Sequence, residues 1–223
     1  MNILFAQMRR DLALIWAGRG EAAVMLAFFL IIITLFPLAI GPDMATLRPM
    51  ALPVIWIAAL LASLAGFSRI FAEDVRSGWV DQVALSPLPL GIYALSKAVT
   101  HWLAGGLPML LATPVMALML YVDLESLAPL MLALAIGTMA LTLLGILAAA
   151  LGEGARNSGS LMALLVLPLA VPVLIFGTLA STPDDGGLLS PHMLLLMAVL
   201  AVLLAIVPVA AAAALVEAET DSS

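Results

Sequence analysis

The stretch from Ala22 to Ile40, AAVMLAFFLIIITLFPLAI, decides the fold because it contains no charged residue. A helix crosses the hydrocarbon core of a bilayer with about 20 apolar residues, and backbone in lipid must satisfy its own hydrogen bonds. Five more uncharged windows follow, at about 50–67, 98–120, 127–151, 158–180 and 192–216. With 65% hydrophobic and 10% charged residues, the sequence predicts an all-α membrane protein. We expect six transmembrane helices in a single transmembrane domain over residues 1–223.

The basic residues predict how these spans are oriented. Seven of the eight Lys and Arg residues lie before span one, between spans two and three, or between spans four and five. The exception is Arg48, between spans one and two. Because loops rich in Lys and Arg stay in the cytoplasm, we expect both termini and the loop at 68–97 to be cytoplasmic.

Residues 2–18 are too polar and too short to cross a membrane, yet they have an apolar side. An amphipathic helix of this kind lies flat in the membrane interface. We therefore expect an interfacial helix, although Asp11 interrupts the pattern. The residues that share the apolar side of the helical wheel are Leu4, Phe5, Met8, Leu12, Ile15 and Trp16.

The loop at 68–97 is mixed in charge but rich in large apolar side chains. Gly78 can end or bend a helix, and the run from Ser86 to Pro89 breaks one. The pattern predicts a short pair of helices that packs on something, whereas an ordinary hydrophilic connection would not need Phe71 or Trp79. The residues expected to carry contacts with a partner are Glu73, Asp74, Arg76, Gly78, Trp79, Val80, Pro87 and Pro89.

Two spans carry helix-packing signals. Span four repeats small residues at multiples of four, which lets another helix approach closely; they are Ala133, Gly137, Gly145 and Ala149. In span five, Pro168 and Pro172 each remove an intrahelical hydrogen bond. We interpret them as helix breaks that line a path, with tolerated prolines in ordinary packing as the alternative.

The sequence lacks the motifs of catalysis and of ATP binding. It has no Cys, no GxxxxGK[ST], HExxH or GxSxG, and no carboxylate or Lys in the middle of a span. We expect no catalytic residue, no metal site and no cofactor bound by this chain, and a basic patch for nucleic acid is missing. His101, at the start of span three, is a candidate haem contact, although a lone His near the interface is more commonly a hydrogen-bonded side chain.

Four runs resemble a known family: FFLIIITLFPLAIGP (28–42), VIWIAALLASL…RIFAEDVRSGWVDQVALSPLPL (54–90), KAVTHWLAGGLPMLLATPVMALML (97–120) and LLVLPLAVPVLIFGTLA (164–180). Together with the layout, they are similar to the CcmB family, which supplies the permease subunit of the ABC-2-type haem exporter of bacterial cytochrome c maturation. The resemblance implies a bacterial inner-membrane subunit that assembles in two copies. It also implies a CcmA-like ATPase partner docked on the 68–97 loop, a haem-handling CcmC-like subunit and a small CcmD-like subunit. Haem would be the handled ligand, passed to a periplasmic chaperone, and ATP would act through the partner.

Two other functions stay open at this point. One is an ABC-2 permease for another amphipathic substrate, such as a lipid or a drug. The other is a non-conducting scaffold whose spans transmit ATP-driven motion to a haem-handling partner.

The charge asymmetry makes a direct prediction of topology. Alkaline phosphatase, which is active only in the periplasm, should be inactive when it is fused after Ser223 or inserted at Ser77, because both sites are expected on the basic side. The same enzyme inserted near Asp123, between spans three and four, should be active. Activity at Ser77 would contradict the topology.

Overall fold

The computed structural model describes residues 2–18, 20–153, 158–183 and 187–222, so that Arg19, Arg156, Asp184 and Asp185 lie outside it. The described residues are helical or in short turns, which confirms the all-α class. Among the described residues, six helical segments are long and apolar enough to cross a membrane. They are Ala22–Ile40, Met44–Arg76, Leu90–Met119, Leu124–Gly152, Met162–Ala180 and Pro191–Glu217.

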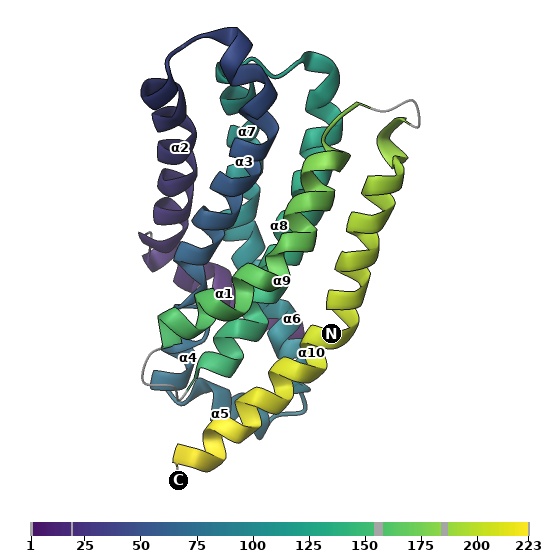
Figure 1. Ribbon diagram of the computed structural model, residues 1–223. Helices are drawn as coiled ribbons and strands as arrows, with labels where there is room; N and C mark the ends of the chain where they lie inside the picture. Colours follow the sequence, from purple (N-terminus) through teal and green to yellow (C-terminus); the bar gives the residue numbers. More distant parts are fainter. Residues whose placement is uncertain (1, 19, 154–157, 184–186, 223) are drawn as a thin grey trace.

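Two helices form the centre of the bundle, α3 (Met44–Phe67) and α8 (Leu124–Gly152). Most of their side chains are buried, whereas the outer helices expose many large apolar residues, as lipid-facing helices do. Around this pair stand α2 (Gly20–Ile40), α7 (Leu107–Met119), α9 (Ser158–Ala180) and α10 (Pro191–Ser222), with one 3₁₀ turn, Gly187–Leu189, before α10 (Figure 1).

The loop between spans two and three contains two short helices, α4 (Ala72–Arg76) and α5 (Trp79–Ala84). Gly78 joins them with φ of +66°, a left-handed conformation that glycine adopts without strain. The expected helix pair and the bend at Gly78 are therefore present. A turn after Phe67 separates α4 from α3, so the segment Met44–Arg76 consists of two helices and not of one continuous helix.

Span three begins earlier than the sequence suggested. Helix α6 (Leu90–His101) starts directly after Pro89, which makes the connecting loop shorter than 68–97. The apolar window seemed to begin at 98 because Lys97 carries a charge. Lys97 instead lies inside the helix, buried, with carboxylates beside it.

One turn of π-helix, Trp102–Gly106, joins α6 to α7 within span three. The last two residues of the turn are glycines, and a side chain on Gly105 would collide with Met25 of α2. The Trp102 indole donates a hydrogen bond to Thr138 of α8, at 2.9 Å. π-turns interrupt the regular hydrogen-bond ladder and often mark functional sites.

Aromatic rings from α3 fill the gaps left by the small residues of α8. The Trp56 ring lies between Gly137 of α8 and Gly177 of α9, and the ring of Phe67 covers Gly145. Trp56 also donates a hydrogen bond to Ser181, at 3.0 Å. The repeat of small residues therefore serves close packing, as predicted. At Gly137 and Gly145 the space is filled by aromatic side chains and not by the backbone of a neighbouring helix.

The prolines of α9 do not break it. The helix runs without interruption from Ser158 to Ala180, and both Pro168 and Pro172 lie on its exposed side, while Ala170 and Val173 face the bundle. The helix break expected at these prolines is therefore absent, and their role in lining a path stays a prediction. Each proline removes one backbone donor, and in α9 that loss is tolerated without unwinding.

The tight fit around Trp56 predicts a specific loss of stability. A Cβ on Gly137 would lie 2.3 Å from the ring, and overpacking of a filled core typically costs about 1–3 kcal/mol. Gly137→Ala should lower the thermal unfolding temperature of the detergent-solubilised protein, and adding Trp56→Phe should recover part of the loss.

The matched control is Gly20→Ala, since a Cβ there meets nothing within 4 Å. Equal unfolding temperatures for Gly137→Ala and Gly20→Ala would contradict the packing described above.

Candidate functional site

The carboxylate of Asp74, on α4, is the centre of a buried cluster of charges. Its side chain is only 1% exposed, accepts two hydrogen bonds and forms an ion pair with a third residue. The Arg10 guanidinium of α1 donates at 2.8 Å and the Tyr93 hydroxyl of α6 at 2.5 Å, and the Lys97 ammonium of α6 pairs with the carboxylate at 2.5 Å. One side chain therefore joins three helices that are far apart in the sequence.

A second carboxylate, Asp11 of α1, lies beside the first. It accepts hydrogen bonds from Lys97 at 3.2 Å, from Arg10 at 3.1 Å and from the Gln7 amide at 3.0 and 3.1 Å. Burial raises the pKa of Asp11 above its ordinary value, and the nearby Lys97 charge offsets this only in part. Asp11 is therefore the group that interrupts the apolar pattern of α1, and it does so because it faces protein.

Helix α5 joins the same cluster through Trp79. The indole nitrogen donates to the Gln7 oxygen at 3.1 Å, and the Arg10 guanidinium lies 4.0 Å from the centre of the ring. A cation at this distance is attracted to the face of an aromatic ring. We call the following seven residues the ionic network: Gln7, Arg10, Asp11, Asp74, Trp79, Tyr93 and Lys97.

The ionic network balances two carboxylates with two cations in a site that excludes most water. Taking charges out of water is costly, and the cost is recovered only when each charge keeps good partners. Asp74 and Asp11 share Arg10 and Lys97, so no member can leave without stranding another. The network therefore fixes α1, α4, α5 and α6 relative to one another.

The outer side of α4 and α5 offers a different surface. Glu73 and Arg76 are mostly exposed and form an ion pair with each other. Leu85, which follows α5, is 90% exposed, and Val75 is 43% exposed. Exposed apolar side chains bordered by charges are typical of a protein contact surface.

The structure divides the eight residues expected to contact a partner into two groups. Glu73, Arg76, Pro87 and Pro89 are exposed. Asp74 and Val80 are buried, Gly78 is half-buried, and Trp79 is held by α1. Asp74 and Trp79 therefore act on a partner indirectly at most in this arrangement, by positioning the exposed residues.

His101, the expected haem contact, ends α6 and is 6% exposed. Its ring lies 6.1 Å from that of Phe67, and Gly66 leaves room for it on α3. The imidazole would have to leave this packing before it could reach a ligand on the surface. Its role toward haem stays a prediction.

Sequence reasoning missed five members of the ionic network: Gln7, Arg10, Asp11, Tyr93 and Lys97. Two signals were present in the sequence. Asp11 stood among apolar residues of an amphipathic helix, and Lys97 stood at the edge of an apolar window. An unexplained charge next to a membrane span indicates a partner of opposite charge.

Comparison with known proteins gives one consistent result. Residues 2–218 match the model of a protein family described as CcmB protein. A protein named Heme exporter protein B from Bradyrhizobium diazoefficiens is 42% identical over 217 residues, which cover 96% of this chain and 98% of the relative. A protein of the same name from Pseudomonas aeruginosa is 40% identical, over 96% of this chain and 96% of the relative. The one from Escherichia coli K12 is also 40% identical, over 93% of this chain and 94% of the relative.

The ionic network makes a prediction about stability. Asp74→Ala should leave the buried Lys97 and the partly buried Arg10 with Asp11 as their shared counter-charge, and removing one partner of a buried pair typically costs about 3–5 kcal/mol. The variant should unfold at a clearly lower temperature in detergent, and Asp74→Ala combined with Lys97→Met should be more stable than Asp74→Ala alone.

Glu73→Ala is the matched control, because it removes a neighbouring carboxylate whose ion pair is exposed. Exposed pairs contribute about 0–1 kcal/mol. If Asp74→Ala were as mild as Glu73→Ala, the network would not hold these helices together.

Proposed function

The chain belongs to the CcmB protein family, and from this premise we propose that it is the permease subunit of a haem exporter. Two observations support the proposal. Relatives that match nearly the whole chain are named Heme exporter protein B, and six helical segments of the described residues are long and apolar enough to cross a membrane. The proposed location is the bacterial inner membrane, with both termini in the cytoplasm.

The energy for transport is proposed to come from a separate ATPase subunit, because the chain has no phosphate-binding motif of its own. The ATPase, of the CcmA type, would dock on α4 and α5. A CcmC-like haem-handling subunit, a small CcmD-like subunit and a second copy of this chain would complete the complex. Haem would then pass to a periplasmic chaperone.

The observation that carries the proposed coupling to an ATPase is the attachment of α4 and α5 to the membrane helices. Asp74 of α4 is held by Tyr93 and Lys97 of α6, and α6 is the first part of span three. A push on α4 would therefore move span three directly, where a loosely attached loop would absorb the motion. A charge-assisted network of this kind is stiff because each bond is short and directional.

The exposed side of α4 and α5 is the proposed contact surface for the ATPase. Leu85 offers an apolar anchor, and Glu73 and Arg76 offer charges beside it. Interfaces concentrate their energy in a few such side chains, with central truncations typically costing about 2 kcal/mol or more.

A second candidate function, a non-conducting scaffold, has an observation in its favour. The centre of the bundle is filled by large buried rings such as Trp56 and Phe67, and the prolines of α9 face outward. A haem path would then run between this chain and another subunit, and not through one bundle. The chain would transmit motion in either case.

Copurification tests the proposed contact surface. Leu85→Glu should reduce recovery of the ATPase subunit with the tagged permease about tenfold or more, since it places a charge in an apolar contact. The amount of permease in the membrane should be unchanged, because Leu85 makes little contact within the chain.

Arg48→Gln is the control, since Arg48 lies at the other end of α3 in an exposed ion pair with Asp123. Full ATPase recovery with Leu85→Glu would remove the contact surface from this side of α4 and α5. Loss of ATPase recovery with both Leu85→Glu and Arg48→Gln would mean that the loss does not come from a contact at Leu85.

A further inference from the structure

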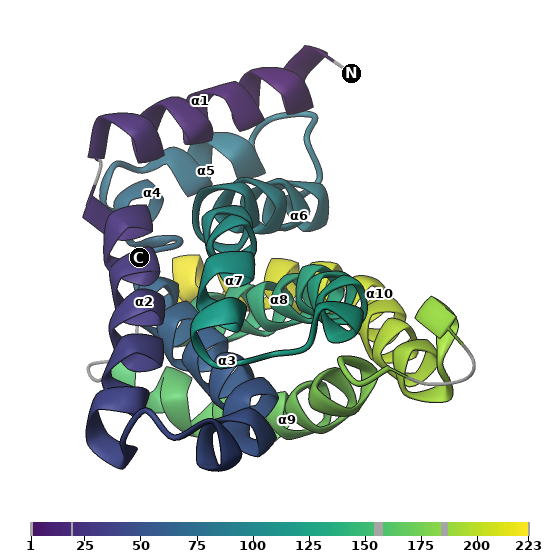
Figure 2. The same cartoon turned by 90° about the horizontal axis from the view of Figure 1, so that it is seen from above.

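Helix α1 turns two of its polar side chains, Gln7 and Asp11, toward the protein. Gln7 and Asp11 are 5% and 2% exposed, in the ionic network, whereas Phe5 is 71% exposed. Figure 2 shows α1 stretched across α5 and α6 on the outside of the bundle. A helix on a water-soluble protein has the opposite arrangement, with its apolar side buried. The outer side of α1 is therefore suited to contact with lipid.

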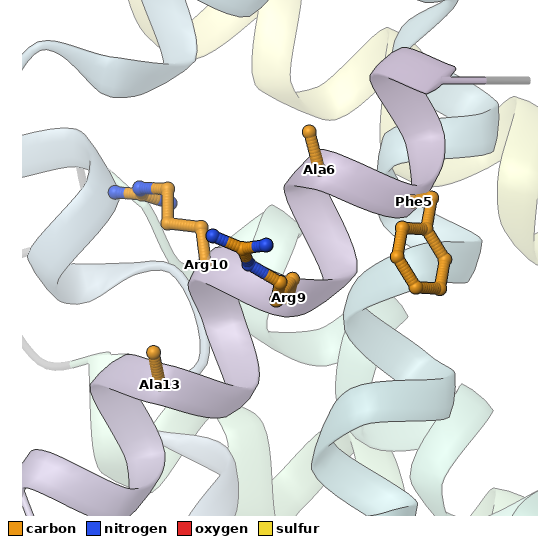
Figure 3. A pocket seen from close by; sticks show the side chains of 5 residues that line it. All are labelled: Phe5, Ala6, Arg9, Arg10 and Ala13. Atoms are coloured by element: carbon orange, nitrogen blue, oxygen red, sulfur yellow. The ribbon is translucent and has the colours of Figure 1, made fainter.

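An open hollow of about 490 Å³ lies on this outer side. Its walls are Phe5, Ala6, Arg9, Arg10 and Ala13, so that an aromatic ring and two small residues stand beside two guanidinium groups (Figure 3). Small side chains leave room for a ligand to lie against the helix, and Phe5 offers an apolar contact.

The two arginines of this hollow are not equivalent. Arg10 is engaged by Asp74 and Asp11. Arg9 is exposed, and within the described part of the chain no carboxylate lies within ion-pair distance of it. The Arg9 guanidinium is therefore free to pair with an anion from outside, and guanidinium groups bind phosphate well because their donors match its oxygens.

The position of α1 specifies where such an anion comes from. Helix α1 ends at Gly18, and the first membrane-spanning segment begins at Ala22. The ionic network also ties α1 to Lys97, within the segment that forms span three. The outer face of α1 therefore lies at the depth of the lipid headgroups, where anionic phosphates meet the first carbons of the acyl chains.

We propose that Phe5, Ala6, Arg9 and Ala13 form a binding site for an anionic phospholipid. The lipid phosphate pairs with Arg9, and its upper acyl segments lie against Phe5 and the two alanines. Because α1 shares the ionic network with α4 and α5, a lipid bound here also braces the unit proposed to receive the ATPase. The lipid site itself does not depend on that proposed function.

Lipid retention by the full-length chain tests the site. Protein purified in a neutral detergent is mixed with dioleoylphosphatidylglycerol or dioleoylphosphatidylcholine, and bound lipids are counted by native mass spectrometry. Arg9→Gln should bind the phosphatidylglycerol about fivefold more weakly, the effect of one basic residue at an anionic surface. Binding of the zwitterionic lipid should change little.

Arg76→Gln is the matched control, since it removes the same charge from an exposed position on α4. It should retain phosphatidylglycerol like the unmodified chain. Equal losses for Arg9→Gln and Arg76→Gln, or no loss with Arg9→Gln, would overturn the proposal.

A second measurement uses the absence of cysteine from the chain. A spin label on Ala6→Cys, in nanodiscs that contain phosphatidylglycerol, should be reached by oxygen more readily than by a water-soluble nickel complex, because the label lies among lipid. Preferential contact with the nickel complex would contradict the site. If the label became immobile only when partner subunits are added, the outer side of α1 would contact a protein and not lipid. That result would also overturn the proposal.

Discussion

Burial of the Asp74 carboxylate is the constraint on which the arrangement of the loop, the N-terminal helix and span three depends. An ionised carboxylate removed from water needs donors of good geometry, and this one obtains them from Arg10, Tyr93 and Lys97. These donors belong to α1 and α6, so the positions of both helices relative to α4 follow from one side chain. Asp11 then neutralises the remaining charge of Lys97 and brings in Gln7 and, through it, Trp79.

The molecule has two kinds of interior as a result. In the bundle, α3 and α8 pack by shape, with the rings of Trp56 and Phe67 in spaces left by glycines. Beside it, α1, α4, α5 and the start of α6 are held by charge. A π-turn at Trp102–Gly106 lies between these two regions within span three. Such a turn breaks the regular hydrogen-bond ladder, so the ladder of span three is not continuous between α6 and α7.

The spans, the helix pair and the bend at Gly78 could be predicted because each depends on a local pattern: an apolar window, a break at proline, a glycine in the right place. The ionic network could not, because its bonds join residues far apart in the sequence, 64 positions for Arg10 with Asp74 and 86 for Lys97 with Asp11. The start of span three was misplaced for the same reason. Lys97 has the charge of a loop residue, and only the structure shows that Asp11 and Asp74 neutralise it inside a helix. Pro168 and Pro172 show the opposite case. Their local sequence predicts a helix break, but α9 continues through both prolines.

The central claim is that α1 and the α4–α5 pair form one rigid unit through Asp74, and a distance distribution tests it directly. Cysteines introduced at Ala13 and Arg76, both exposed, can carry spin labels without competition from native thiols. Pulsed electron paramagnetic resonance should give a single narrow distance in the otherwise unmodified chain and in a Glu73→Gln background. In an Asp74→Asn background the distribution should broaden, because Arg10 and Lys97 lose their shared counter-charge. A broad distribution in the unmodified chain, or a narrow one that Asp74→Asn leaves unchanged, would contradict the account.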